Sequence, residues 1–401
     1  MSDDCMMQGF PPAVADRVTL ENWRTAPYSR WGFQHVREII PTASIPCDPS
    51  NTRSFRRRPV DLGNVSYADG NQQKTVRQML DGSANDAFMV LHNGHIVCED
   101  YGNGMGPSTP HILFSVSKSV TSMVAGIVVG RGQLDPEALI TNYIPEMSGS
   151  AYAGATVRHL LDMTAGIAFD EDYGATDGAI IRYREAANWN VRSVTDPDLH
   201  LRAFLSEMDE VEKLHGGQFR YISPNTDLLG WVIERATGTR FVDVMSEALW
   251  RPMGATRDAY ITIDSVGAPR TAGGICATIY DLAMFGQLIV ENGERDGLPI
   301  IPGDWITDTR TNGSTEEWNI GDYADDYPDW AMRYRNKWYV TGDADAPLFA
   351  AGIHGQFLYI DPARKLVCAK FSSQADVVDS AEERSFLRAC IAIADTLENT
   401  E

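Results

Sequence analysis

A serine and a lysine three positions apart stand near the start of the segment ILFSVSKSVTSMVAGIVVGRG, residues 112–132. The residues after Lys118 are mostly apolar, so this charged residue lies in a stretch that is typical of a protein core. On a helix, side chains three positions apart share a face, about one turn from each other. The spacing therefore predicts that the side chains of Ser115 and Lys118 meet.

The apolar residues after Lys118 fall on every side of the predicted helix, as in a helix inside a core; they are Val120, Met123, Val124, Ala125, Ile127, Val128 and Val129. Burial disfavours an ammonium ion, and so does the positive end of the helix dipole, so we expect a lowered Lys118 pKa. A neutral lysine can accept the proton of a serine hydroxyl and make it a nucleophile. The alternative is that Lys118 extends its ammonium to water while Ser115 caps the helix, and so short a pattern also arises by chance.

A tyrosine further along the chain offers the proton transfer that a serine nucleophile still requires. Tyr221 ends an extended segment, 219–221, just before a helix that is predicted to start at Ser223. At this strand-to-helix junction its phenol could pass a proton between the serine, Lys118 and a leaving group. The alternative is that Tyr221 packs at the boundary between two lobes.

The composition argues against several classes of protein. The 401 residues are 43% hydrophobic and 22% charged, which are ordinary globular values, and no apolar run approaches the ~18 residues of a membrane span. A formal net charge of −21 opposes nucleic acid and anionic membranes, and the short basic stretch RSFRRRP is interpreted as a solvated loop. The N-terminus lacks the positive charge and apolar run of a secretory signal, so we expect a cytoplasmic protein.

The sequence indicates no metal and no cofactor. The six cysteines, Cys5 among them, are far apart and form no C-x-x-C pair, so neither a zinc site nor a dense disulfide framework is indicated. The eight histidines include no H-E-x-x-H, and His92 and His95 flank a turn where exposure to water explains them. GNGMG at 102–106 lacks the dinucleotide-binding spacing, and the G-x-S-x-G elbow of α/β-hydrolases is absent.

Two predicted hairpins place β-strands near the two ends of the chain. Residues 87–101 and 355–373 each hold two β-prone runs, around Asn93-Gly94 and Asp361-Pro362. Short connections join antiparallel neighbours, so the sheet should be mainly antiparallel. A C-terminal helix with acidic residues in its first turn should pack on this sheet through Phe386, Leu387, Cys390, Ile391 and Ala394.

The middle of the chain is predicted to be mostly helical. TVRHLLDMTAG from Thr156 and SPNTDLLGWVIERATG from Ser223 each begin with a capping hydroxyl and end at glycine. The predicted fold class is α/β of the α+β type, an antiparallel sheet flanked by helices with an inserted, mostly helical lobe. We expect an N-terminal extension at 1–80 packed on the sheet lobe, the sheet lobe at 81–135 and 255–401, and the helical lobe at 136–254.

Three motifs occur in a fixed order: SVSK on the first core helix, YISPN before a later helix, and the strand AAGIHGQFLYI near the C-terminus. Together they resemble the penicillin-recognising serine hydrolases, which include serine β-lactamases, D-Ala-D-Ala peptidases and class-C-like carboxylesterases. Within this superfamily the chain is most similar to the 6-aminohexanoate-dimer hydrolases, which cleave linear nylon oligomers. That closer likeness includes NWRTAPYSRWGFQHVREIIPTA, DEDY and GIHGQ and spans residues 22–394. The resemblance implies the β-lactamase/transpeptidase-like fold.

The resemblance also implies roles for the residues of these motifs. Ser115 would be the acylated nucleophile, Lys118 its base and Tyr221 the proton relay to the leaving group. The backbone N–H groups of Ser115 and of Ile353, on an edge strand, would form the oxyanion hole, where one donor is worth ~3 kcal/mol. Tyr173 and Tyr339 would line the substrate cleft, although an aromatic residue is also common in a core. The other expected substrate-site residues are His354, structural or substrate-lining, and Arg184.

The chain departs from the family pattern at three positions. The Lys-Thr-Gly of β-lactamases and peptidases is replaced by AAGIHG, and the third residue of Tyr-x-Asn is Ser223, so β-lactam turnover should be poor. Arg184 stands where amide-active members carry an acidic residue, which reverses the charge offered to a substrate ammonium. This arginine could instead bind a carboxylate, or simply be solvated.

The predicted function is a serine hydrolase that forms an acyl-enzyme on Ser115 and cleaves small esters and linear amides. The alternative is a non-catalytic ligand-binding or scaffold member of the same fold, since fold does not guarantee chemistry. The expected partner is a small-molecule ester or amide, with no nucleic acid and no membrane, and a homodimer stays open.

Overall fold

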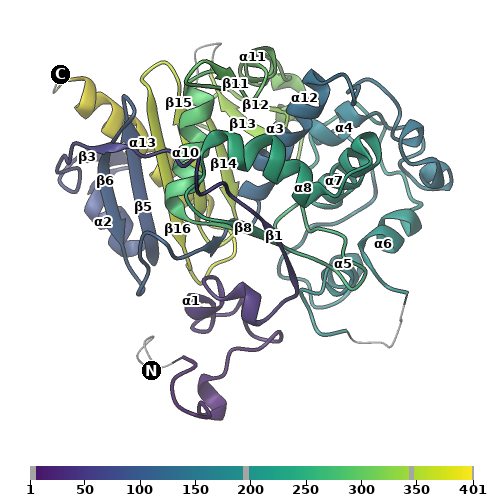
Figure 1. Ribbon diagram of the computed structural model, residues 1–401, viewed down its shortest axis with the longest axis horizontal. Coiled ribbons are helices and arrows are strands. Elements are labelled where there is room, and N and C mark those ends of the chain that lie inside the picture. The colour runs from purple at the N-terminus through teal and green to yellow at the C-terminus, as the bar shows by residue number, and fades with distance from the viewer. Residues whose placement is uncertain (1–5, 193–197, 343–346, 400–401) are drawn as a thin grey trace.

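The structure is a computed structural model that describes residues 6–192, 198–342 and 347–399. Its large central sheet contains β2 (Arg56–Arg57), β5 (Asn85–His92), β6 (His95–Tyr101), β12 (Met332–Arg335), β13 (Trp338–Thr341), β14 (Leu348–Gly352), β15 (Gln356–Asp361) and β16 (Leu366–Ser372). The strand order is β12-β13-β14-β15-β16-β5-β6-β2 (Figure 1). Neighbours run antiparallel except β2 and β6, which are parallel. The predicted, mainly antiparallel sheet is confirmed.

The two predicted hairpins lie side by side in this sheet. Asn93 and Gly94 have φ angles of 48° and 71°, the left-handed conformation that a tight turn between β5 and β6 requires. β15 and β16 form the second hairpin, and β16 pairs with β5. The basic stretch that contains Arg56 is not a loop throughout, because β2 joins the sheet beside β6. The chain after β2 continues along β6. His92 is buried and His95 is half-buried, so the expectation that both are exposed to water is wrong.

Helices cover both faces of the sheet, which explains why β5 is buried along almost its whole length. Its alternate residues Ala87, Met89 and Leu91 belong to the core shared with α3 (Val116–Gly130) and α10 (Ile279–Val290). Phe88 and Val90 point to the other face and belong to the core shared with α2 (Val76–Gly82) and α13 (Ser380–Glu398). A strand buried on both faces reads as a continuous apolar run.

The C-terminal helix packs on the sheet as predicted, and Phe386 stacks on Phe357 at 4.6 Å between ring centroids. The prediction of its apolar face is wrong at one residue, because Ile391 is half-buried and Ile393 is buried instead. The inward face follows the helical spacing from Phe386 through Cys390 to Ile393, and Ile391 lies beside it.

A second group of helices lies on the other side of α3 (Figure 1). These helices are α4 (Val157–Leu161), α5 (Ala179–Ala186), α6 (Leu201–Glu207), α7 (Pro224–Thr237) and α8 (Phe241–Met245). Thr156 caps α4 as predicted, but α4 ends at Leu161, well before the glycine expected to end it. α7 begins after Ser223 as predicted and ends at Gly238. Gly238 has a φ of 66°, a left-handed conformation that glycine adopts easily because it has no Cβ. Ser223 itself does not cap α7, because its hydroxyl donates to Glu171.

The remaining strands form small sheets: β1 (Thr42–Ile45), β8 (Ala259–Thr262), β9 (Ile275–Ala277) and β7 (His111–Ile112) in one, β3 (Ser66–Asp69) with β4 (Gln72–Thr75), and β10 (Glu294–Arg295) with β11 (Leu298–Pro299). The remaining α-helices are α1 (Ser29–Gly32), α9 (Arg251–Met253), α11 (Gly303–Thr311) and α12 (Thr315–Asn319). Cys47, Cys98, Cys276, Cys368 and Cys390 are free, and Cys5 lies outside the described residues. Within the described ranges, none of the helices is both long and apolar enough to cross a membrane.

Candidate active site

Ser115 lies at the position just before α3, where the chain turns from β7 into the helix. Its side chain makes no capping hydrogen bond, so the interpretation of Ser115 as a helix cap is wrong. Instead, Lys118 Nζ donates a hydrogen bond of 2.8 Å to Ser115 Oγ. The predicted meeting of the two side chains is therefore present in the structure.

The turn into α3 is strained at Phe114, whose φ of 43° is unusual for a bulky residue. Phe114 is held among other rings, with centroids 6.2 Å from Trp23, 4.9 Å from Phe33, 5.9 Å from Trp189 and 5.5 Å from His354. Strained backbone persists where its surroundings leave no alternative, and it is common at functional sites. The ring cluster thus fixes the direction in which Ser115 leaves the turn, which the sequence did not reveal.

Lys118 is only 1% exposed, so the alternative in which its ammonium extends to water is wrong. Besides Ser115, its Nζ donates to the carbonyl of Ala272 at 2.9 Å. Burial lowers the pKa of Lys118 to about 8; nearby Glu171 opposes this decrease and Arg270 adds to it. A substantial fraction of Lys118 is therefore neutral near pH 8 and able to accept a proton.

Tyr221 lies beside this pair, and the centroid of its ring is 4.9 Å from Lys118 Nζ. Burial raises the pKa of its phenol, while hydrogen-bonding contacts with Ser115 and Tyr339 oppose that increase. The backbone N–H of Tyr221 donates to Asp322 Oδ2 at 2.9 Å, which fixes this part of the chain. The predicted strand before Tyr221 is wrong: the segment is irregular and makes backbone bonds to 163 and 317 in place of a strand ladder. The phenol of Tyr221 is protonated at neutral pH and faces Ser115.

The backbone N–H groups of Ser115 and Ile353 lie on neighbouring stretches of chain. A Cβ built on Gly352 would lie 3.0 Å from the Ser115 nitrogen, so only glycine allows β14 to come this close. Neither N–H donates to any residue in the described part of the chain. The expectation of an edge strand is wrong, because β12 and β13 continue the sheet beyond β14 and Ile353 lies in the turn after it.

Glu171 is a central residue of the site for which no role was predicted, although it belongs to the motif DEDY. Its carboxylate accepts hydrogen bonds from the Ser223 backbone N–H at 2.5 Å, from the Ser223 hydroxyl, and from Tyr173 Oη at 3.0 Å. Glu171 therefore positions Tyr173 and the start of α7 relative to each other.

A buried ion pair between Arg270 and Asp227, connected to Lys118 through Ala272, was not predicted from the sequence either. Arg270 donates to Asp227 Oδ2 and to the hydroxyl of Tyr183. The other oxygen of Asp227 accepts the Ala272 N–H at 2.8 Å, and the Ala272 carbonyl accepts from Lys118. This chain of bonds fixes the carbonyl that orients the Lys118 side chain. Its members come from separate parts of the sequence, and no local spacing connects them.

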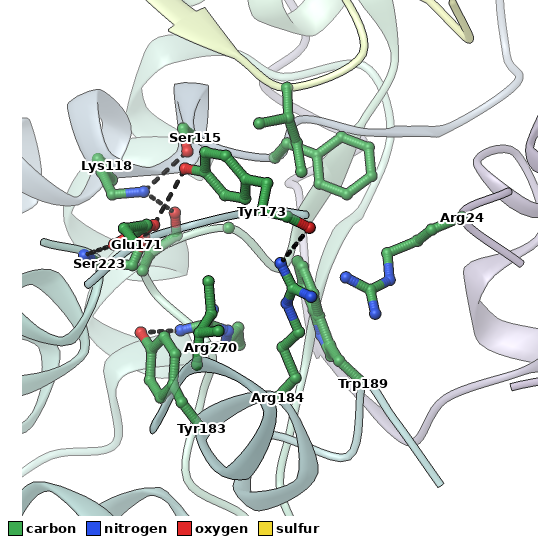
Figure 2. A pocket seen from close by; sticks show the side chains of 15 residues that line it. Arg24, Ser115, Lys118, Glu171, Tyr173, Tyr183, Arg184, Trp189, Ser223 and Arg270 are labelled. Carbon is green, nitrogen blue, oxygen red and sulfur yellow. Dashed lines mark hydrogen bonds between the residues drawn. The ribbon is translucent and has the colours of Figure 1, made fainter. Parts of the chain in front are cut away.

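Two pockets of about 420 Å³ each meet at Ser115, and both are lined by Ser115, Tyr173 and Ile353. We call the first the arginine pocket (Figure 2); it is also lined by Arg24, Lys118, Glu171, Arg184, Trp189 and Arg270. We call the second the tyrosine pocket; it is also lined by Tyr221, Tyr323, Asp326, Tyr327, Tyr339 and Glu383. Lys118 thus borders one pocket and Tyr221 the other.

The four residues expected at the substrate site lie in different places. Tyr173 borders both pockets, Tyr339 lines the tyrosine pocket, and Arg184 lines the arginine pocket. Arg184 is only 9% exposed, so the interpretation of a solvated arginine is wrong. His354 lines a third hollow of about 550 Å³, which shares Arg24, Tyr173, Arg184 and Ile353 with the arginine pocket. The Nδ1–H of His354 donates to the Gln374 carbonyl at 2.9 Å, and burial lowers its pKa to about 4, so this ring is neutral and supports the turn at Ile353.

Comparison with known proteins shows which family has this sequence and fold. The sequence pattern of the family described as Beta-lactamase matches residues 73–393. The chain belongs to the beta-lactamase family. A 6-aminohexanoate-dimer hydrolase from Paenarthrobacter ureafaciens is 33% identical to this beta-lactamase-family chain over 371 residues, 92% of this chain and 91% of the relative. Esterase EstB from Burkholderia gladioli is 27% identical over 169 residues, 41% of each chain.

A solved structure extends this comparison to the fold. A candidate 6-aminohexanoate-dimer hydrolase from Bacillus anthracis superimposes with a TM-score of 0.86 at 28% identity, covering 97% of this chain and 99% of its own. The predicted family and fold class are therefore confirmed. The relatives are named as hydrolases, which supports a hydrolytic role for this member of the beta-lactamase family.

Proposed function

We propose that this protein is a serine hydrolase that forms an acyl-enzyme on Ser115 and cleaves small esters and linear amides. The observation that carries the proposal is the 2.8 Å contact between Ser115 Oγ and the buried Lys118 Nζ at the point where the two pockets meet. Retention of nucleophile, base and tyrosine in one buried site disfavours a non-catalytic scaffold.

Acylation begins when neutral Lys118 accepts the proton of Ser115 Oγ, which attacks the carbonyl carbon of the substrate. The carbonyl oxygen becomes negative in the tetrahedral intermediate, where the N–H groups of Ser115 and Ile353 can donate to it. Tyr221 passes a proton to the leaving oxygen or nitrogen. The bond from the carbonyl carbon to the leaving group then breaks, and the acyl group stays on Ser115.

Deacylation reverses these roles with water as the nucleophile. A water molecule replaces the leaving group, gives its proton to the Tyr221 and Lys118 pair, and attacks the ester carbonyl. The proton returns to Ser115 Oγ as the ester bond breaks and the acid is released. The leaving group departs through the tyrosine pocket, because Tyr221 borders that pocket.

This arrangement favours esters over unactivated amides, and both over β-lactams. An alcohol leaves without full protonation, whereas an amide nitrogen must be protonated first, so amide cleavage depends more on Tyr221 and Tyr173. A β-lactam carries its carboxylate on the leaving side, where Asp326 and Glu383 line the pocket in place of a cation. Like charges there oppose binding.

The test is covalent labelling of the serine. The protein is treated with a neutral fluorophosphonate probe, and the intact mass and the modified peptide are measured. We expect the mass of one probe on Ser115 and loss of p-nitrophenyl ester hydrolysis in Ser115→Ala. Ser122→Ala is the matched control, because Ser122 is buried in the same helix and donates to the Ser119 carbonyl at 3.0 Å. An unlabelled protein without esterase activity would establish the non-catalytic alternative.

A further inference from the structure

Two arginines of the arginine pocket have no acidic partner among residues 6–192, 198–342 and 347–399. Arg24 donates one hydrogen bond, to Asn190 Oδ1 at 2.5 Å, and Arg184 donates one, to the Tyr173 carbonyl at 3.3 Å. Both acceptors are neutral. Arg184 is more than nine-tenths buried, and both residues line the same pocket.

Other arginines close by are neutralised. Arg270 in the same pocket pairs with Asp227, and Arg182 on the same helix as Arg184 pairs with Glu207 at 2.5 Å. The arginine pocket also contains the Glu171 carboxylate, but Tyr173 and Ser223 already donate to it. The charges of Glu171 and Asp172 act on Arg184 only from a distance, so neither arginine has a carboxylate in contact with it among the described residues.

The two guanidinium groups also act on each other. They lie on the same side of the pocket, away from Ser115 and Lys118 (Figure 2). Burial, with smaller contributions from the nearby charges of Arg184 and Arg270, lowers the pKa of Arg24 to about 9, so Arg24 stays charged at neutral pH. The Arg24 guanidinium lies over the rings of Trp23 and Trp189, at 5.5 Å and 5.9 Å from their centroids. Uncompensated buried charge costs free energy, which an anion bound between the two groups would recover.

The position of the arginines relative to the reacting atoms shows which half of a substrate they would contact. Ser115 attacks where the two pockets meet, and Tyr221, the proposed donor to the leaving group, borders the tyrosine pocket. The leaving group then occupies the tyrosine pocket, and the acyl chain extends into the arginine pocket. An anion on the far end of the acyl chain would reach Arg24 and Arg184.

We propose that the acyl group of the substrate carries a carboxylate, which Arg24 and Arg184 bind, so that the substrates are monoesters and monoamides of dicarboxylic acids. This inference rests on the proposed serine hydrolase function. Ser115 forms an ester with one carboxyl carbon, the alcohol or amine leaves with a proton, and water releases the free dicarboxylate. The second carboxylate takes no part in bond making.

The charges of the tyrosine pocket fit the same substrate polarity. Asp326 and Glu383 line the leaving side, so a cationic or neutral alcohol or amine is favoured there over an anionic one. In a linear 6-aminohexanoate dimer the acyl half carries an ammonium and the amine half a carboxylate. Each charged end of that dimer would face a pocket of its own sign, the ammonium facing the arginines and the carboxylate facing Asp326 and Glu383. The adipic acid monoamide of a diaminohexane has the matching polarity.

The experiment compares mono-p-nitrophenyl esters of glutaric to suberic acid with counterparts whose free carboxylate is capped as a methyl ester. We expect the wild-type kcat/KM to be at least about tenfold higher for the anionic member of the best pair. Arg24→Gln and Arg184→Gln should each lower the anionic-to-capped ratio about tenfold, and Arg184→Asp should favour an amide dimer with an ammonium on its acyl half. Arg182→Gln removes a paired arginine from the same helix and should leave the ratio unchanged.

The outcomes separate this inference from the proposed function. Fluorophosphonate labelling and hydrolysis of the capped ester report on Ser115 without any anion. If both occur but the ratio is near one in the wild type, or does not change in Arg24→Gln, the anionic acyl site is refuted while the hydrolase stands. If neither occurs, the proposed function fails and this inference with it. Should Arg184→Gln unfold in a thermal melt, Arg24→Gln and Arg184→Lys still decide the question.

Discussion

The two pockets beside Ser115 are similar in size and differ in the kind of charge that lines them. The arginine pocket carries Arg24 and Arg184, and both guanidinium groups are charged at neutral pH although burial lowers the pKa of each, that of Arg24 to about 9. The tyrosine pocket carries Glu383, whose pKa is raised to about 7 by burial, with Asp326 adding to that increase. Selection of the acyl half should therefore change little near neutrality and weaken only as the pH approaches the Arg24 pKa of about 9, whereas selection of the leaving half changes near neutrality.

The catalytic groups also divide between the pockets. Lys118 borders the arginine pocket and Tyr221 the tyrosine pocket, with Ser115 common to both. The base that activates the serine thus lies on the acyl side, and the proton donor lies on the leaving side. Changes on one side should affect activation of the nucleophile, and changes on the other should affect departure of the leaving group.

The largest effect is expected from Lys118→Met, which removes the base but keeps an apolar side chain of similar length. Ester hydrolysis should fall at least ~10³-fold, and Ser115→Ala combined with it should be no worse than either single variant, because nucleophile and base act as one unit. Steady-state kinetics on a p-nitrophenyl ester measures this. The matched control is Lys337→Met: Lys337 is also buried with a pKa far below its usual value, yet its Nζ contacts the Met163 sulfur and lines neither pocket. A double variant much slower than both singles would contradict the shared role.

A large and selective effect is expected from Tyr221→Phe. Removing the phenolic proton should lower amide hydrolysis by ~10²-fold or more, while an ester with a good leaving group should lose much less. The ratio of kcat/KM for an amide and for the p-nitrophenyl ester of the same acid measures this selectivity. Tyr334→Phe is the control, because Tyr334 packs against Tyr339 at 4.9 Å without bordering either pocket. Equal losses on both substrates would indicate that Tyr221 acts only through packing.

The helix that carries Ser115 and Lys118 was predictable because the distance between two side chains on one helix depends on local geometry alone. The hairpins were predictable for the same reason, since Asn93-Gly94 selects its turn without help from the rest of the chain. Arg24 belongs to a quoted motif but lies far from Arg184 in sequence, and only tertiary packing brings them into one pocket. The pairing of Asp227 with Arg270 and the place of Ile353 after an interior strand likewise depend on packing that no spacing reveals.

The pH dependence should follow the base on the acyl side. Folding lowers the Lys118 pKa to about 8, so the neutral, proton-accepting form grows as pH rises through that value. When the ester concentration is well below saturation, kcat/KM for a neutral ester should rise about tenfold from pH 7 to well above pH 8 and then level off. Activity that falls over this interval would show that the protonated lysine is the active form. The rate of fluorophosphonate labelling should follow the same curve, since it also needs an activated Ser115.

The smallest effect is expected from Glu383→Gln on the leaving side. Because burial raises the pKa of Glu383 to about 7, its carboxylate is mostly protonated at pH 6 and mostly charged at pH 8. The variant should therefore raise KM for esters of cationic alcohols such as choline by about threefold at pH 8 and hardly at all at pH 6. KM for esters of uncharged alcohols should change little at either pH. Glu382→Gln is the matched control, because the neighbouring carboxylate pairs with Lys74 at 3.2 Å and lines neither pocket. Esters of one acid with choline and with its uncharged dimethylbutyl analogue, compared at both pH values, measure the difference. A loss that is equal at pH 6 and pH 8 would mean that Glu383 acts through its hydrogen bond from Tyr327 and not through its charge.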